Sequence, residues 1–146
     1  SKLKLKIKNI KYYIVGEGEL KKELYDYSQS LGLKENIIFT GYLKNPFSIM
    51  KKADVLLLTS TYEGFSNVIL ESLCMNVPVV ATNSAGGNKE IIIDNKNGFL
   101  TNIGDSNDIV KKLILVKKKK KFQINVSQYE INLIGKQYEK AFYVGK

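Results

Sequence analysis

Two glutamates that stand eight positions apart, Glu63 and Glu71, are the residues of this chain whose spacing most clearly suggests chemistry. The segment between them begins as a small polar turn and continues into an apolar stretch of helical composition, residues 66–75. Gly64 and Ser66 suit a tight turn with an N-cap hydroxyl. A strand that runs into a helix start leaves unpaired amides and the positive end of the helix dipole facing outward. Such an arrangement favours a phosphate or another anion.

The position of Glu63 refines this prediction. A carboxylate at the mouth of an anion site would repel a phosphate unless it bound something adjacent, such as sugar hydroxyls. The pattern therefore indicates a sugar attached to a phosphate. Helical steps of about 100° place Asn67 and Glu71 on one side of the helix and most apolar residues on another. The alternative is that both glutamates are ordinary solvated side chains.

Cys74 is expected to be a small buried hydrophobe and not a reactive thiol.

The residue types that are missing remove most other kinds of catalysis. Because the chain has no histidine, it has no Ser-His-Asp or Cys-His arrangement and no histidine metal site. Its single cysteine has no partner for an internal disulfide. No run approaches the roughly 18 apolar residues of a membrane span, and the lysine-rich start lacks the apolar middle of a secretory signal. We expect a cytoplasmic protein whose chemistry rests on carboxylates, lysines and backbone groups.

The net charge of +9 comes from the two flanks of the chain. Of the 23 lysines, five lie in residues 1–11 and five in residues 117–121, and the other 13 nearly balance the 14 acids. There is no arginine for contacts to guanine, and the tyrosines do not alternate with the lysine runs, so specific nucleic-acid binding is not expected. A lysine run is most often a solvated face. The functional alternative is a peripheral contact with the anionic inner face of the cell membrane.

Apolar runs and helical segments alternate along most of the chain. Strands are expected at residues 12–15, 36–40, 54–59, 77–82 and 98–101, and helices at 19–31, 46–52, 66–75 and 105–116. This order predicts an α/β fold, a Rossmann-like open parallel sheet flanked by helices. The 146 residues fit one domain, with residues 1–9 and 117–146 as flanking segments. Within the second flank, residues 129–143 have helical spacing whose packing the sequence does not reveal.

In an open parallel sheet, ligands gather at the carboxyl ends of the strands. Four loops meet this rule: Gly16-Glu17-Gly18, Gly41-Tyr42-Leu43, Ser60 to Ser66, and Asn83 to Asn88 with Gly86 and Gly87. Glycines after a strand permit a close backbone approach to a ligand, so the four loops together favour a nucleotide-type cleft. NAD is disfavoured, because Lys21 stands where a dinucleotide fingerprint requires its third glycine, and a P-loop is absent.

Several motifs in order carry a resemblance to a known family. The two glutamates lie within Glu-Gly-Phe-Ser-Asn, and the motifs Pro78-Val79-Val80-Ala81-Thr82, Gly86-Gly87-x-x-Glu90 and Asn97-Gly98-Phe99-Leu100 follow. Val15-Gly16-x-Gly18 and Phe39-Thr40-Gly41 precede them. From about Tyr12 to Val116 the chain resembles the C-terminal, donor-binding domain of the retaining glycosyltransferases of family 4, the "group 1" transferases. The resemblance implies one half of a GT-B fold.

The resemblance also implies a role for each part of the site. Glu63 would bind hydroxyls of the transferred sugar as the catalytic residue, and Glu71 would accept from the ribose hydroxyls. The diphosphate would lie on the amides of Gly64, Phe65, Ser66 and Asn67, with the remaining donor-binding contacts from Gly16, Gly18, Gly41, Tyr42, Leu43, Gly86 and Gly87. The Gly41 loop would lie against the base and the Gly86-Gly87 loop beside the sugar. Such enzymes need no cofactor and no metal, because amides and basic side chains hold the diphosphate.

The chain departs from the family's pattern at the diphosphate clamp. The family usually takes an arginine and a lysine from a motif before the strand that corresponds to Tyr12–Val15, and this chain contains neither that motif nor an arginine. The resemblance also implies an N-terminal acceptor domain, which we expect to lie outside these residues. We therefore expect a fragment that binds a nucleotide sugar but is inactive alone. The whole enzyme would transfer the sugar to a glycan or lipid-linked acceptor during polysaccharide biosynthesis.

Two alternatives stay open at this point. One is half of a nucleotide-sugar epimerase of the related two-domain fold. The other is a non-catalytic α/β interaction module that uses Lys117 to Lys121 against anionic partners. The donor base, the sugar, the acceptor and the linkage do not follow from the sequence.

Overall fold

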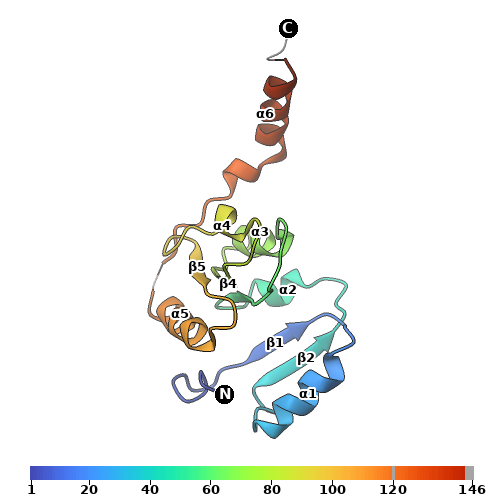
Figure 1. Ribbon diagram of the computed structural model, residues 1–146, viewed down its shortest axis with the longest axis vertical. Helices are drawn as coiled ribbons and strands as arrows, with labels where there is room; N and C mark the ends of the chain where they lie inside the picture. The colour runs from blue at the N-terminus through green and yellow to red at the C-terminus, as the bar shows by residue number, and fades with distance from the viewer. Residues whose placement is uncertain (120, 144–146) are drawn as a thin grey trace.

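The computed structural model describes residues 1–119 and 121–143, in which strands and helices alternate as the sequence predicts (Figure 1). The strands are β1 (Tyr12–Val15), β2 (Ile37–Gly41), β3 (Leu56–Leu58), β4 (Val79–Thr82) and β5 (Gly98–Thr101). The α-helices are α1 (Lys21–Ser30), α2 (Phe47–Met50), α3 (Asn67–Cys74), α4 (Asn88–Ile91), α5 (Ser106–Lys118) and α6 (Ile131–Tyr143), with a 3₁₀ helix η1 (Ser127–Tyr129). The two short helices α4 and η1 were not predicted.

All strand pairs are parallel, but hydrogen bonding divides the described strands into two groups. β1 pairs with β2, and β3, β4 and β5 form a second sheet with β4 in the centre. The predicted Rossmann-like class is therefore confirmed, although the sheet is not continuous, because within the described residues neither β1 nor β2 pairs with β3, β4 or β5. The β1 side chains Tyr12, Tyr13 and Val15 are 41–47% exposed, which is unusual for apolar residues of a parallel strand.

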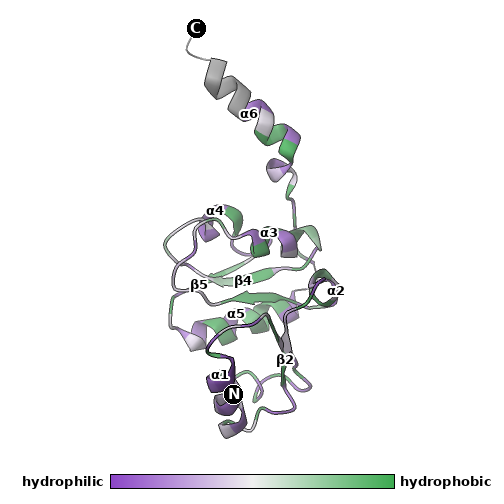
Figure 2. Ribbon diagram, turned by 90° about the vertical axis from the view of Figure 1, so that its right-hand side faces the viewer, coloured by the Kyte–Doolittle hydropathy of each residue, from purple (hydrophilic) through white to green (hydrophobic). Residues whose placement is uncertain are grey.

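The core lies on both faces of β4, whose four residues are all buried. Val79 and Ala81 pack with Ile69, Leu73 and Ile91 from α3 and α4. The intervening residue, Val80, packs on the opposite face with Phe99 of β5 and with Leu113 and Val116 of α5. Successive strand residues point to opposite faces, so the apolar run Val79–Thr82 is what a strand covered by helices on both sides requires. Figure 2 shows these layers, with α3 and α4 on one side and α5 on the other.

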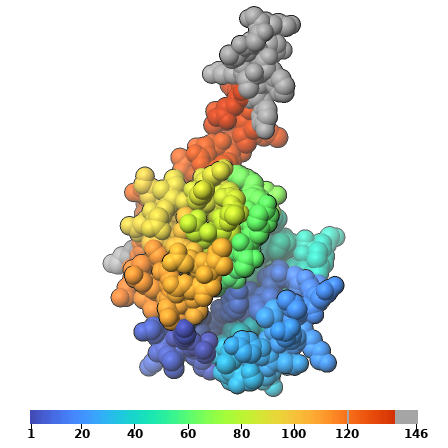
Figure 3. Space-filling view, viewed as in Figure 1, coloured from blue at the N-terminus to red at the C-terminus, as the bar shows by residue number. Residues whose placement is uncertain are grey.

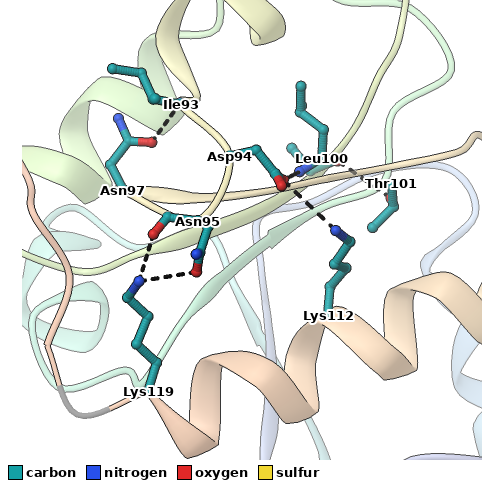
Figure 4. A network of polar contacts seen from close by, with 9 residues as sticks. Ile93, Asp94, Asn95, Asn97, Leu100, Thr101, Lys112 and Lys119 are labelled. Carbon is teal, nitrogen blue, oxygen red and sulfur yellow. Dashed lines mark hydrogen bonds and ion pairs between the residues drawn. The ribbon is translucent and has the colours of Figure 1, made fainter.

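The Asn97-Gly98 pair joins a turn to β5: Asn97, shown in Figure 4, is the last residue before the strand, and Gly98 is the first residue of the strand. The buried Asn97 side chain accepts a hydrogen bond from the Ile93 amide at 2.8 Å and donates to the Ile91 carbonyl at 2.9 Å. A Cβ on Gly98 would lie 2.2 Å from the Val79 carbonyl oxygen. Lys119, at the end of α5, donates to the side chain of Asn95 in the same turn at 3.0 Å. This motif therefore has a structural role: it lets β5 approach β4 closely.

The flanking segments are partly built into the domain. The first residues lie beside α5 (Figure 3), where the Lys2 ammonium donates to the Ser106 hydroxyl and the Asn107 side chain at 2.9 and 2.8 Å. After α5 the chain contacts both faces of the β3–β5 sheet in turn. Phe122 packs against Phe99 on the α5 face, and Ile124 and Val126 then pack with the buried residues of α3 and α4 on the opposite face. α6 then extends away from the body (Figures 1 and 2).

Helix α6 is described only in part. Ile131 at its start is 84% exposed. The side chains of Tyr138 and Phe142, which belong to the predicted helical spacing of residues 129–143, lie outside the described part of the chain. Within the described residues, no helix has the length and apolar character that crossing a membrane requires.

Replacement of Asn97 by alanine tests the structural role of the turn. The Asn97→Ala variant leaves the Ile93 amide and the Ile91 carbonyl without their partner, and we expect a loss of about 2–3 kcal/mol in the free energy of unfolding. Urea denaturation measures it. The control is the exposed Asn102→Ala, which should change stability by less than about 0.5 kcal/mol. Equal losses in both variants would contradict the structural role.

Candidate donor site at the carboxyl ends of the strands

Glu63 lies in the loop between β3 and α3, as predicted, and its carboxylate is held by a neighbour. The Ser60 hydroxyl donates a 2.7 Å hydrogen bond to Glu63 Oε1. The Glu63 side chain is half-buried, and the adjacent Tyr62 forms a bridge with Ala85 of the loop after β4. The carboxylate is thus held by a residue of its own loop, and the neighbouring residue of that loop pairs with the loop after β4.

Helix α3 begins next to this carboxylate with its amides open. Ser66 is the N-cap residue, as predicted, with an extended backbone (φ −83°, ψ 101°). The prediction of a capping hydroxyl is wrong: the Ser66 side chain makes no cap bond, and the residue is only 3% exposed. Within the described residues, the amides of residues 64–68 donate to no protein acceptor. These amides and the helix dipole together make a local site for negative charge.

Asn67 and Glu71 share one side of α3, as predicted, and line an open hollow of about 370 Å³ between α2 and α3. The other lining residues are Phe47, Leu70, Cys74 and Met75. The prediction that Cys74 is buried is wrong, since its side chain is exposed. The reason is its position three residues after Glu71, which places the two side chains on the same side of the helix. The hollow therefore combines a carboxylate and an amide with apolar walls.

A second open hollow, of about 420 Å³, lies on the other side of the α3 start. Its lining includes Gly64, Phe65, Gly86, Gly87, Lys89 and Glu90. The two loops that form it touch through their backbones, because the Gly87 amide donates to the Gly64 carbonyl at 2.6 Å. A Cβ on Gly86 would lie 1.7 Å from the Glu63 carbonyl oxygen, and the φ of Gly86 is +125°. Gly86 and Gly87 thus permit a close approach between two loops of the protein, where the sequence had suggested an approach to a ligand.

The loops after β1 and β2 form a separate group of predicted site residues. A register shift at the end of β1 brings Gly16 to Gly41, and the Gly16 amide donates to the Gly41 carbonyl at 2.9 Å. Tyr42 is 79% exposed and Leu43 is half-buried. No atom lies within 4 Å of a Cβ built on Gly16 or Gly18, so the face of this loop is open.

The charged pair in the same group is Glu17 and Lys21. The Lys21 ammonium donates to both Glu17 carboxylate oxygens at 3.0 Å, and this hydrogen bond lowers the pKa of Glu17 below its ordinary value. Both side chains are largely exposed. Lys21 is thus held beside the Gly41 loop, at the position where a dinucleotide fingerprint would have its third glycine.

Sequence reasoning missed the residues that support the site from behind. Thr82 donates through its hydroxyl to the Ser60 carbonyl, and Asn88 donates through Nδ2 to the Thr82 carbonyl at 3.1 Å and to the Ser84 hydroxyl at 3.2 Å. Tyr129 stacks edge-on against Phe65 at 5.9 Å and donates to the Glu90 carbonyl at 3.1 Å. A polar residue that closes an apolar strand, as Thr82 does, was the available signal. For Tyr129 the sequence carried none.

The residues that the structure describes contain no group of three or more acidic, cysteine or histidine side chains that could hold a metal ion.

Comparison with known proteins identifies the class and then the family. The parallel sheets flanked by helices match structures of the GT-B class, among them the lipopolysaccharide outer core galactosyltransferase WaaB in its apo form. That match has a TM-score of 0.83 and 25% identity, and it covers 91% of this chain and 40% of WaaB. The sequence profile of the family described as "Glycosyl transferases group 1" matches residues 1–132. The chain therefore belongs to the group 1 glycosyl transferase family.

Two further relatives bear on function. HepE from Anabaena, solved with UDP-glucose, has a TM-score of 0.76 and 28% identity, with coverage of 93% of this chain and 41% of HepE. The N-acetylgalactosamine-N,N'-diacetylbacillosaminyl-diphospho-undecaprenol 4-alpha-N-acetylgalactosaminyltransferase of Campylobacter jejuni is 35% identical over 105 residues. The aligned part covers 72% of this chain but only 29% of that enzyme, so the chain spans less than a third of this relative's length.

The contact between the two loops can be tested with a matched pair of glycine variants. Gly86→Ala drives a methyl group into the Glu63 carbonyl and strains a positive φ, and we expect it to lower the free energy of unfolding by about 2–4 kcal/mol. Gly64→Ala meets no atom within 4 Å and should cost less than about 1 kcal/mol. Urea denaturation of both variants gives the comparison. If Gly86→Ala were as stable as Gly64→Ala, the close approach would be absent in solution.

Proposed function

We propose that this chain is the donor-binding domain of a retaining glycosyltransferase, which holds a nucleoside diphosphate sugar for transfer to a glycan or lipid-linked acceptor. The observation that carries the proposal is the open set of amides at the start of α3, placed between the carboxylates of Glu63 and Glu71. A neutral-to-positive helix start flanked by two acids suits a ligand with negative charge in its middle and hydroxyls on both sides. A nucleoside diphosphate sugar has this order of groups.

Each part of the site then has a chemical task. The diphosphate lies on the amides of residues 64–67, which stabilise the negative charge that grows as the bond from the sugar's anomeric carbon to the phosphate oxygen breaks. Glu71, in the hollow between α2 and α3, accepts hydrogen bonds from the ribose hydroxyls. Glu63 accepts from hydroxyls of the sugar, which occupies the hollow beside Gly86 and Gly87. The base lies against Gly41, Tyr42 and Leu43, and the Gly16 to Gly18 loop closes the donor side.

We assign acceptor binding to a second domain of the same enzyme, since the chain covers 29% of the Campylobacter relative and 40% of WaaB. Closure of the two domains would orient the acceptor hydroxyl and exclude water. No metal is assigned to the diphosphate, because the α3 amides supply the stabilising dipoles. Membership of the transferase family favours this proposal over an epimerase half or a non-catalytic interaction module.

Calorimetric titration with UDP and with UDP-glucose tests the assignment of the two glutamates. Glu71→Ala should raise the dissociation constants of both ligands by about tenfold, because each complex loses a hydrogen bond between the ribose and a carboxylate. Glu63→Ala should change the dissociation constant of UDP by less than about twofold and raise that of UDP-glucose by about tenfold. Glu35→Ala removes an exposed acid that stands before the amino end of β2, at the opposite end of that strand from Gly41; it serves as the control and should bind both ligands normally.

Three outcomes would count against the proposal. If the wild-type protein bound neither UDP, GDP nor the corresponding nucleotide sugars at millimolar concentration, the proposal of a donor site would be wrong. Equal losses for both ligands in both glutamate variants would refute the separate roles of Glu63 and Glu71. A requirement for Mg²⁺, seen as loss of UDP binding in EDTA, would contradict the assignment of the diphosphate to backbone amides.

We also propose a weak peripheral contact with anionic membrane lipid through lysines at the end of α5. Several flank lysines are committed to the protein, since Lys4 donates to the Gly32 carbonyl at 3.1 Å and Lys119 donates to Asn95. Lys117 and Lys118, in the last turn of α5, are exposed. A polybasic surface of this kind is attracted to anionic lipid by about 1 kcal/mol per lysine.

Vesicle sedimentation tests this contact. Charge reversal of Lys117 and Lys118 should weaken binding to phosphatidylglycerol-containing vesicles by about tenfold or more, and raised salt should do the same to wild type. The matched control reverses Lys51 and Lys52, which are exposed after α2 and should matter less. Equal binding to vesicles of pure phosphatidylcholine would show that lipid charge is not recognised.

A further inference from the structure

The Ser60 hydroxyl is a partly buried group in the loop after β3. It donates to Glu63 Oε1 at 2.7 Å, and within the described residues it is the hydrogen-bond donor found on that carboxylate. A hydroxyl that donates to a carboxylate makes a short, charge-assisted bond. Glu63 Oε1 thereby carries a protein donor, whereas Oε2 accepts from none within the described residues and keeps its full capacity to accept from a ligand.

The position of Ser60 is itself fixed by residues of β4 and α4. Thr82 is 1% exposed and donates through its hydroxyl to the Ser60 carbonyl. Asn88 is fully buried and donates to the Thr82 carbonyl at 3.1 Å. Hydrogen bonds therefore link α4 to β4, β4 to Ser60, and Ser60 to the Glu63 carboxylate. Asn88, at one end of this series of hydrogen bonds, is fully buried, whereas Glu63, at the other end, is half-buried in the loop after β3.

A free glutamate side chain in a loop would sample several rotamers, and ordering it on binding would cost side-chain entropy. A carboxylate that is already held avoids most of this cost, so its remaining oxygen meets the sugar in a fixed place. The backbone contact between Gly64 and Gly87 limits the motion of the same loop, but it does not act on the carboxylate. Ser60 is the residue that does.

We infer that Ser60 is a positioning residue of the donor site, which holds the Glu63 carboxylate so that Oε2 faces the transferred sugar. The inference rests on the proposed function, since it acts through the role assigned to Glu63. It adds a residue outside the amides and the two glutamates, and it predicts that Ser60 affects the nucleotide sugar but not the free nucleotide.

A double-mutant cycle on Ser60 and Glu63 tests the inference. Wild type is titrated with UDP, UDP-glucose and UDP-N-acetylgalactosamine, and the tighter sugar nucleotide is then used for all variants. Ser60→Ala should raise the dissociation constant of that ligand by about five- to tenfold and change that of UDP by less than about twofold. Ser60→Thr keeps the hydroxyl and should restore most of the affinity. In the Glu63→Ala background, Ser60→Ala should have less than about a twofold further effect, because its partner is gone.

The control is Ser30→Ala, which removes a hydroxyl that donates to the Tyr27 carbonyl at 2.8 Å at the end of α1 and should leave both ligands unaffected. Additive losses for Ser60→Ala and Glu63→Ala, or an equal loss of UDP in Ser60→Ala, would overturn the inference and leave Glu63 in its proposed role. If Glu63→Ala bound the sugar nucleotide like wild type, the role of Glu63 would fail and the inference would fall with it. Absence of binding to either sugar nucleotide would overturn both.

Discussion

The close backbone approach between the loop after β3 and the loop after β4 is the constraint on which the site depends. The Gly87 amide reaches the Gly64 carbonyl at 2.6 Å, and the space beside Gly86 is taken by the Glu63 carbonyl. This contact fixes where the turn lies from which α3 starts. Because the amides of residues 64–68 and the Glu63 carboxylate belong to that turn, the electrostatics of the site follow from a backbone contact that only glycine permits.

The core makes this contact possible. β4 is buried on both faces, so its end is a fixed point from which the Gly86 loop departs. The Asn97-Gly98 turn brings β5 against the other edge of β4, and Thr82 at the end of β4 reaches across to Ser60. The residues of the site thus lie at the surface, but the hydrogen bonds that hold them lead back to buried residues. An open loop alone would not hold a carboxylate beside a helix start.

Much of this arrangement was accessible from the sequence, and particular residues show why. The alternation of apolar runs and helical stretches predicted the order of strands and helices, because burial on both faces requires continuous apolar strands such as Val79–Thr82. The spacing of Asn67 and Glu71 predicted that they share one side of α3, since helix geometry relates residues four apart. Ser66 was placed correctly at the helix start, but the same local reasoning assigned its hydroxyl to a cap bond that the structure does not contain.

The amino-acid sequence by itself determined the fold class, the position of the helix start and the pair of carboxylates beside it, because these depend on local periodicity and residue chemistry. The tertiary structure alone decided which groups meet across loops: Gly86 against Glu63, Thr82 against Ser60, and Tyr129 against Phe65. It also decided that Cys74 lines a hollow instead of the core. The physical reason is that these contacts join residues distant along the chain, and their distances are set by the packing of the whole sheet and not by neighbours in sequence.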